Sequence, residues 1–592
     1  MAQRLAIDPL TRIEGHLRIE LETDGGLITK AWSEATQFRG IETILKGRDP
    51  RDAWAFTQRI CGVCTTVHAI ASITAVENAI GSMPPRQAQA IRDLVIAAAG
   101  IQDHVIHFYH LHALDWVNVA GAATADPAKA VAFAEAIGST WTGNTLQRMT
   151  EVRDTVKGIV DSGQLSIFTG GYWDHPDYRL PPEADLMAVS HYLDALEFQR
   201  SMIRINTVFG GKNPHPNFLV GGMACTIDQD SSTSINQVQI DQIQQWVNET
   251  LTFVESCYVP DAMAIMGVYK DYFDIGKSTP NYMAVGLIGA TYAGDPANTA
   301  PTNATQRIAG GVIYNDDLST VADFDPSQIA ESIASAWYKY SGDGSPLPPA
   351  QGETTVDYTG PSVPYGDAWL GDSDKYTWSK APRYNGKPMQ VGPLARVMLA
   401  YARGDKGVEA LGGTIQGTKD LVDSAAATLG ISLKQLNSTG GRTLARAVEC
   451  LIEAQTMAYD TFPNFVKNLA AGDIDVFNAS KWEPSSWPKE SSGYAFVEVA
   501  RGTLSHWVTI KDGAIDNYQA VVPSTWNSGG RDEQGQMGPY EQSLAGEGNH
   551  PLANVAEPLE PLRTIHSFDP CMSCAVHVLD ADGNEQELVV SL

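Results

Sequence analysis

The stretch RICGVCTTVH at residues 59–68 decides the fold, together with its counterpart DPCMSCAVH at residues 569–577. Each contains a C-x-x-C pair followed by a histidine, and the two pairs lie near opposite ends of the 592-residue chain. Cysteines three positions apart at a turn or helix start face the same way, so each pair can offer two thiolates to one centre. We therefore expect the two ends of the chain to meet at a four-sulfur site.

Two ordinary uses of such pairs remain open at this point, a structural zinc site and a redox dithiol. Zinc ribbons usually enclose a loop of roughly 15–20 residues, whereas almost the whole chain separates these two pairs. A dithiol leaves the symmetry of the two motifs unexplained. Thiolates also suit soft redox metals and can bridge two ions. Residue chemistry alone does not select nickel.

Composition and length describe a folded protein with 43% hydrophobic and 19% charged residues. Because both cysteine pairs must meet, we expect residues 1–577 to form one intertwined domain.

The 69 acidic residues exceed the 41 basic ones, giving a net charge of -28. Nucleic acid is therefore excluded as a partner, and an anionic membrane surface is disfavoured. Seven cysteines are too few for a disulfide scaffold, and Cys225, Cys257 and Cys450 lack the spacing of an iron–sulfur cluster.

The N-terminus MAQRLAIDPLTRIEGH has no apolar signal-peptide core. Uninterrupted apolar stretches such as residues 94–99 are far short of the roughly 20 residues of a membrane helix. The sequence therefore predicts a soluble chain without an export signal or transmembrane segment of its own.

Hydrophobic periodicity predicts a mainly helical α+β fold with a central bundle of long helices and small peripheral β-sheets. Helices are expected at about residues 85–115, 181–211, 235–253 and 444–457. Hairpins are expected around Asp24-Gly25-Gly26 and around Asp512-Gly513. Residues 275–395 are rich in Gly, Pro, Asn, Asp and Tyr, which indicates a loop-rich lobe.

Seven motifs in order along the chain resemble those of the large, catalytic subunit of nickel–iron uptake hydrogenases. They are TRIEGH (11–16), FRGIE (38–42), RICGVCTTVHA (59–69), GGKNPHPN (210–217), ARGTLSHW (500–507), YQAVVPSTWN (518–527) and DPCMSCAVH (569–577). The resemblance implies that fold, and reversible heterolytic cleavage of H2 at a nickel–iron centre whose iron carries CO and cyanide. Cys61, Cys64, Cys571 and Cys574 would bind nickel, with Cys64 and Cys574 also binding iron.

Further residues take their expected roles from the same resemblance. Arg501 would lie above the metals beside a cyanide, although many relatives have proline where this chain has Ala500. Glu14 would relay protons from a cysteine, the alternative being helix capping or a pair with Arg12. Further expected groups are the carboxylates Asp103 and Asp569, His68 as a donor to a bridging sulfur, Pro523 and Ser524 around the diatomic ligands, and a magnesium site at Glu42, the carbonyl of Ala520, and His577.

The chain continues past His577 with residues 578–592, which the resemblance identifies as an extension removed by a maturation endopeptidase. Implied partners are an iron–sulfur small subunit, nickel-insertion proteins and a membrane cytochrome b. The small subunit would carry the export signal and take this chain to the periplasm or the periplasmic face of the membrane. An H2-sensing regulatory subunit is the alternative, although such relatives commonly lack the extension. A metal-free, quinone-binding scaffold would lack the four cysteines.

Overall fold

The computed structural model describes residues 3–165, 168, 171–289, 306–362, 365, 368–547 and 550–572. Cys574, His577 and the extension 578–592 lie outside these residues. The longer helices are α3 (Thr65–Ile80), α4 (Arg86–Ile106), α5 (Pro127–Ala136), α6 (Leu146–Ser162), α7 (Pro182–Met202), α9 (Gln237–Phe253), α10 (Val259–Val268), α11 (Pro393–Ala402), α12 (Thr418–Leu429) and α13 (Thr439–Thr456). The shorter ones are α1 (Ile41–Leu45), α2 (Ala53–Thr57), α8 (Arg204–Gly210), α14 (Phe462–Ala470), α15 (Pro523–Ser528), α16 (Pro539–Ala545) and α17 (Leu559–His566).

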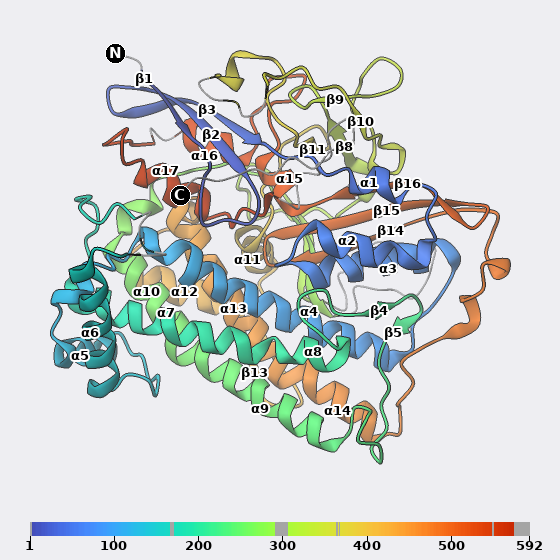
Figure 1. The fold of residues 1–592 in the computed structure, drawn as a ribbon, viewed down its shortest axis with the longest axis horizontal. Helices are drawn as coiled ribbons and strands as arrows, with labels where there is room; N and C mark the ends of the chain where they lie inside the picture. The colour runs from blue at the N-terminus through green and yellow to red at the C-terminus, as the bar shows by residue number, and fades with distance from the viewer. Residues whose placement is uncertain are drawn as a thin grey trace.

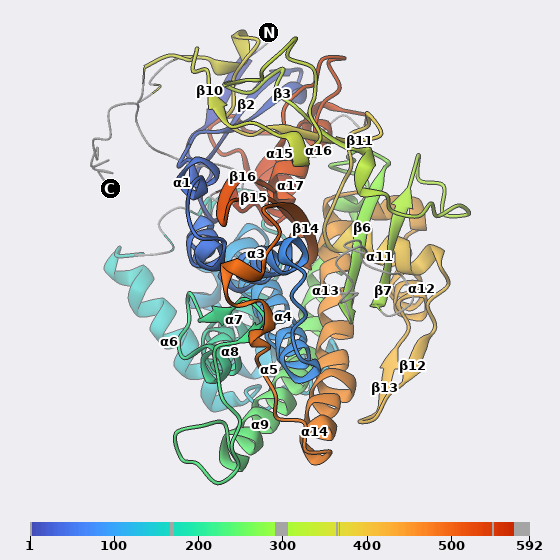
Figure 2. The same ribbon diagram turned by 90° about the vertical axis from the view of Figure 1, so that its right-hand side faces the viewer.

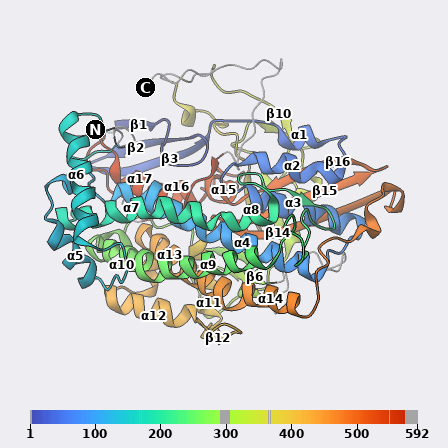
Figure 3. The same cartoon turned by 60° about the horizontal axis from the view of Figure 1, so that its bottom comes forward.

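Long helices form the core of the molecule, as the periodicity predicts. Helices α4, α7, α9 and α13 lie side by side in the lower half of Figure 1, and Figure 3 shows α7 and α9 along the same face. Pro182 begins α7, and Gly211 follows α8 in a left-handed conformation. These are the start and stop signals expected from proline and glycine. The mainly helical fold class is confirmed.

Three of the long helices run into a widened, π-type turn within the described residues. Residues His107–His112 follow α4, Val254–Tyr258 join α9 to α10, and Met457–Thr461 join α13 to α14. Each of the last two turns is followed by a proline, Pro260 or Pro463, which has no N–H for the regular ladder. The shift to a π turn lets the helix continue past the missing donor.

Two three-stranded antiparallel sheets flank the bundle. The first consists of β1 (Gln3–Ile7), β2 (Leu17–Asp24) and β3 (Leu27–Ala35), and the second of β14 (Glu490–Val499), β15 (Gly502–Lys511) and β16 (Ala514–Val521). Both predicted hairpins are therefore confirmed. Helix α3 packs on β14 and β15, and it is buried around nearly its whole circumference.

The segment 275–395 contains more β-structure than expected from its composition. Its described residues include the pairs β6 (Tyr282–Gly289) with β7 (Gln306–Ile313), β8 (Ile329–Ser332) with β11 (Ala381–Tyr384), and β9 (Tyr338–Lys339) with β10 (Thr355–Val356). Strands of two to four residues are too short to show an alternating pattern. Residues 282–286 of β6 are buried in succession, so this part of the strand does not alternate either. Figure 2 shows β6 and β7 beside α11.

Smaller pairs complete the described strands, β4 (Phe218–Leu219) with β5 (Gly222–Met223) and β12 (Gly407–Glu409) with β13 (Thr414–Gln416). The two ends of the chain also meet. Glu14 and Cys571 form a parallel β-bridge, and the amide of Met572 donates to the carbonyl of Glu14 at 2.6 Å. The imidazole Nε2 of His566 lies 2.8 Å from the carbonyl oxygen of Thr11. The N-terminal segment therefore closes over the second cysteine motif.

Within the described residues, one continuous helix, Gln237–Val268, is long and apolar enough to cross a membrane by length and composition. Polar residues occur throughout this helix, so it contains no long uninterrupted apolar run of the kind that the sequence prediction rests on. Half of its apolar window is buried in the structure, and α9 and α10 pack against α13. A core helix of a soluble protein satisfies the same criterion, so this finding is weak support for a membrane span.

Candidate metal centre

Three of the four cysteines of the two motifs lie together. The Sγ atom of Cys571 is 3.3 Å from that of Cys61 and 3.8 Å from that of Cys64. All three residues are buried, and each of the three sulfurs lies within 4.8 Å of the others. Residues 64 and 571 are 507 positions apart in sequence, so the site is a product of the whole fold and not a local zinc module.

The start of α3 gives the first pair its conformation. Cys64 is the N-cap of this helix, and the amides of Val63 and Cys64 donate to Sγ of Cys61 at 3.3 and 3.2 Å. The N-terminus of a 16-residue helix also carries a partial positive charge. Both effects favour the thiolate form, which is the form that binds metals.

Cys571 is held from two sides. Its amide donates to Oγ of Ser524 at 2.9 Å, and its thiol donates to Oε2 of Glu14 at 3.2 Å. Pro523 and Ser524 are buried at the start of α15. Arg12, the alternative partner of Glu14, instead pairs with Asp115 and donates to the carbonyl of Leu111. Glu14 is therefore placed to exchange a proton with a cysteine of the cluster.

Arg501 lies between two buried carboxylates. Its Nη1 donates to Oδ2 of Asp103 at 2.9 Å, and its Nε is 3.1 Å from Oδ1 of Asp569. Burial would lower the pKa of Arg501, but Asp569, Asp103 and the nearby thiolates of Cys571 and Cys64 outweigh it and raise that pKa. The guanidinium is therefore charged beside the sulfur cluster.

Asp103 has a changed proton affinity. Burial raises its pKa to about 7, although Arg501 opposes the shift. Oδ1 of Asp569 is ion-paired with Arg501 at 3.1 Å, whereas its Oδ2 accepts no hydrogen bond within the described residues. A buried acceptor of this kind beside three thiols indicates a polar or charged occupant of the space between them.

His68, one turn into α3, forms a buried polar chain. Its Nδ1 is 3.1 Å from Nε2 of His506, whose Nδ1 is 2.6 Å from the hydroxyl of Tyr518. That hydroxyl donates to Oγ of Ser72 at 2.8 Å. A hydrogen bond from His68 to a bridging sulfur stays a prediction, because Cys574 lies outside the described residues.

The expected magnesium ligands Glu42 and Ala520 are adjacent. Oε1 of Glu42 accepts from the amide of Ala520 at 2.9 Å, and Oε2 accepts from Oγ1 of Thr354. A second buried carboxylate, Glu331, lies 3.7 Å from Nζ of Lys380. Carboxylates suit a hard cation, but an ammonium group already supplies positive charge here. His577, the third expected ligand, is not described.

The sequence analysis missed a buried ion-pair network behind Arg501. Arg396 on α11 binds Glu449 on α13 through two nitrogens and Glu498 on β14 through a third. His104, the neighbour of Asp103, is 3.0 Å from Glu449. One signal was available, since Glu449 and Glu453 interrupt the apolar face of a helix four residues apart.

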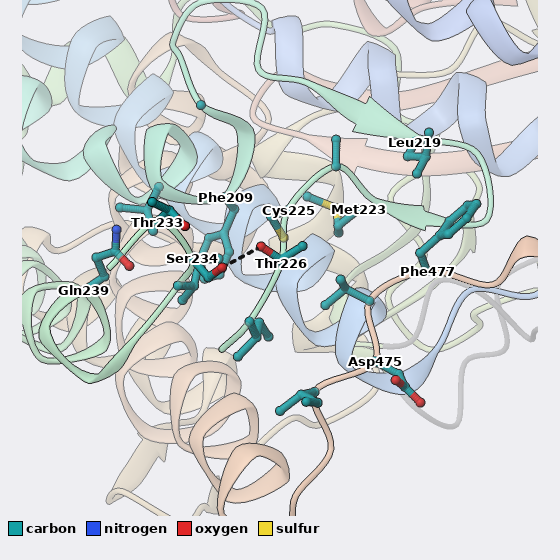
Figure 4. Close-up of a pocket in the computed structure, with 17 residues that line it drawn as sticks. Phe209, Leu219, Met223, Cys225, Thr226, Thr233, Ser234, Gln239, Asp475 and Phe477 are labelled. Atoms are coloured by element: carbon teal, nitrogen blue, oxygen red, sulfur yellow. Dashed lines mark hydrogen bonds between the residues drawn. The ribbon is translucent and has the colours of Figure 1, made fainter. Parts of the chain in front are cut away.

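Two other features lie outside this centre. His191, Cys257 and Asp261 form a second buried cluster, in which Nδ1 of His191 is 2.7 Å from Oδ2 of Asp261. A surface pocket of about 700 Å³ opens between the segments around Cys225 and Phe477 (Figure 4). None of the expected site residues lines this pocket.

Comparison with known proteins agrees with this geometry. Residues 39–577 match the family model described as nickel-dependent hydrogenase, and residues 4–38 match one described as HoxL-like. The uptake hydrogenase large subunit of Rhizobium leguminosarum bv. viciae is 44% identical over 99% of this chain and 97% of its own length. The hydrogenase-1 large chain of Escherichia coli K12 is 42% identical over 98% of this chain and 96% of its own.

Solved structures show the same fold. The Ni-Fe-Se hydrogenase from D. vulgaris Hildenborough in the reduced state has a TM-score of 0.73 and 29% identity, covering 98% of this chain and 100% of that one. The family match, the relatives and the three clustered thiols are consistent with one another. The chain belongs to the nickel-dependent hydrogenase family, as a large subunit of the uptake type and an oxidoreductase that acts on H2.

Proposed function

We propose that this chain cleaves H2 at a nickel–iron centre held by Cys61, Cys64, Cys571 and Cys574. The observation that carries the proposal is the group of three buried, unbridged cysteines whose sulfurs face one another. Thiolates are the ligands that such soft redox metals prefer. When bound, the centre would supply an open coordination edge, with CO and cyanide on the iron, for the heterolytic cleavage of H2. The relatives named uptake hydrogenases favour the enzyme over an H2 sensor.

The protein's own groups would then move the proton. Cys571 donates to Glu14 at 3.2 Å, within reach for transfer from sulfur to carboxylate. Arg501 keeps a permanent positive charge beside the thiols, which suits holding a polar diatomic ligand or polarising H2. Asp103 and Asp569 hold its guanidinium in place. His68 would orient a bridging sulfur, and Pro523 and Ser524 would enclose the diatomic ligands.

We further propose magnesium at Glu42, Ala520 and His577. The adjacency of Glu42 and Ala520 supports this site. The electrons would leave through an iron–sulfur small subunit, since Cys225, Cys257 and Cys450 have neither the number nor the spacing of the ligands of an iron–sulfur cluster. Further proposed partners are nickel-insertion proteins, a maturation endopeptidase that removes residues 578–592, and a membrane cytochrome b. The proposed location is the periplasm or the periplasmic face of the membrane, which cell fractionation would test.

Metal analysis of the purified complex tests the central proposal. Cys571→Ser should abolish nickel binding, because an alcohol is a poor ligand for a soft metal. Cys225→Ser is the matched control, since that thiol lines the surface pocket away from the cluster. Nickel retained at the wild-type level in Cys571→Ser protein would refute the ligand assignment.

A further inference from the structure

Arg501 stands in the short turn between β14 and β15. Ala500 and Arg501 form the two-residue connection between β14 and β15, whose ends pair at Val499 and Gly502. Neither Ala500 nor Arg501 has a positive φ. Such a turn does not match the primed types that suit two-residue hairpins. Its conformation must therefore be set by contacts outside the hairpin.

The start of α11 provides one such contact. Gly392, the N-cap of α11, has φ 116°, and a Cβ there would lie 2.9 Å from the carbonyl oxygen of Arg501. A Cβ on Gly502 would lie 2.8 Å from the amide of Gly392. The turn thus rests directly on the backbone at the N-terminus of α11, and only glycine permits this approach.

Arg396, one turn into α11, provides the second contact. Its Nη2 donates to the carbonyl of Ala500 at 3.1 Å. The same guanidinium is fixed by Glu449 at 2.7 and 2.5 Å and by Glu498 at 2.5 Å. All of these side chains are buried, so the donor that holds the turn is itself rigid.

The network also reaches the partner of Arg501. Glu449 is 3.0 Å from Nε2 of His104, and His104 follows Asp103 on α4. Asp103 in turn accepts from Arg501 at 2.9 Å. A closed ring therefore runs from Arg501 through Asp103, His104, Glu449 and Arg396 back to Ala500, joining α4, α11, α13 and the β14–β15 turn.

We propose that Arg396 is a positioning residue for Arg501. It fixes the backbone that carries Arg501 and, through Glu449, the helix that carries Asp103, so that the guanidinium is held against the thiols. This inference rests on the proposed role of Arg501 beside the metals. Lysine could not replace Arg396, since one ammonium group cannot reproduce the planar fork that binds two carboxylates and a carbonyl.

Crystal structures and kinetics of Arg396→Lys in the large–small complex test the proposal. We expect the 2.9 Å contact between Arg501 and Asp103 to lengthen or break. We also expect kcat per bound nickel to fall by roughly tenfold to a hundredfold, the range for small misplacements of catalytic groups. Arg501 unmoved in the Arg396→Lys structure would overturn the inference, whatever the metal content.

Arg92→Lys is the matched control. Arg92 is also buried, binds Glu77 with two nitrogens at 2.8 and 2.7 Å, and donates to the carbonyl of Gly222 at 2.8 Å. It lies on α4, eleven residues before Asp103, about 16 Å away along the helix. Equal kcat per nickel in the two variants would overturn the inference, because both would then reflect only the loss of a buried ion pair.

Glu449→Gln keeps the test decisive if Arg396→Lys does not assemble. It weakens the same ring with little change of shape, and Arg501 should shift in the same direction; an unmoved Arg501 would contradict the ring. Where Arg396→Lys does assemble, adding Ala500→Pro should recover part of kcat, because proline at the first turn position limits its conformations. Wild-type complex lacking nickel would instead contradict the proposed function.

Discussion

Glu14 meets Cys571 through backbone and side chain together. The β-bridge between the two residues fixes their separation, and the thiol then donates to the carboxylate at 3.2 Å. Arg12, two positions away, is engaged by Asp115. The sequence motif alone left both partners possible for Glu14, because it does not show which group Arg12 meets. Whether Glu14 contacts Arg12 or a cysteine depends on the folding that brings residue 571 next to residue 14.

Glu14→Gln should slow proton transfer without removing the metals. An amide has nearly the shape of a carboxylate but does not alternate between proton acceptor and donor at neutral pH. We expect H2/D2 exchange to fall by about 10²- to 10⁴-fold, the usual contribution of a general acid–base. Nickel content should stay at the wild-type level.

Glu22→Gln is the control for this substitution. Glu22 is a strand carboxylate that pairs with Arg4 and Lys30 near the surface, so exchange should not change. Undiminished exchange in Glu14→Gln protein would show that protons leave the cluster by another route.

At the scale of elements, the sequence predicted helices well and short strands poorly. Proline and glycine mark the limits of the helical segment from Pro182 to Gly211. The pairs β8–β11 and β9–β10 were missed because their strands are short and their partners distant. The network around Arg396 was missed for a related reason, since its members come from four separate elements.

The packing of α3 on β14 should be sensitive to one methyl group. Gly493 on β14 faces α3, and a Cβ there would lie 2.3 Å from the carbonyl oxygen of Ala75. Gly493→Ala should therefore push apart the two elements and lower the free energy of unfolding by about 1–3 kcal/mol. Because α3 carries Cys64 at its N-terminus, nickel retention should also decrease. Thermal denaturation and metal analysis measure the two effects.

Gly158→Ala on α6 is the matched control for this substitution. Nothing lies within 4 Å of a Cβ at this position, and alanine is the better helix former by about 1 kcal/mol. Its melting temperature should equal or exceed that of the wild type. A Gly493→Ala protein with the same melting temperature as the wild type would contradict the close packing of α3 on β14.

At the scale of the whole molecule, the two ends of the chain build one centre. The need for both cysteine pairs at one place could be predicted from their motifs, and the structure brings Cys61, Cys64 and Cys571 together. That residues 1–577 form a single domain stays a prediction, as do the positions of Cys574 and His577. What the motifs could not show is which buried groups hold Arg501 and Cys571 in place.

The extension 578–592 gives a prediction at this scale. Active, nickel-loaded protein should end at His577, and its intact mass should lack these residues. The removed segment carries Asp580, Asp582, Glu585 and Glu587 and no basic residue, so processing should also make the chain less acidic. Protein made without nickel should retain the extension. Active enzyme that still carries residues 578–592 would contradict this expectation.

Infrared spectroscopy of the purified large–small complex tests the central claim most directly. Metal-bound CO and cyanide absorb where protein groups do not, so an iron that carries these ligands has its own bands. We predict these bands in wild-type protein and their loss in Cys571→Ser protein. Wild-type protein fully loaded with nickel and iron that shows no such bands would contradict a nickel–iron centre of this kind.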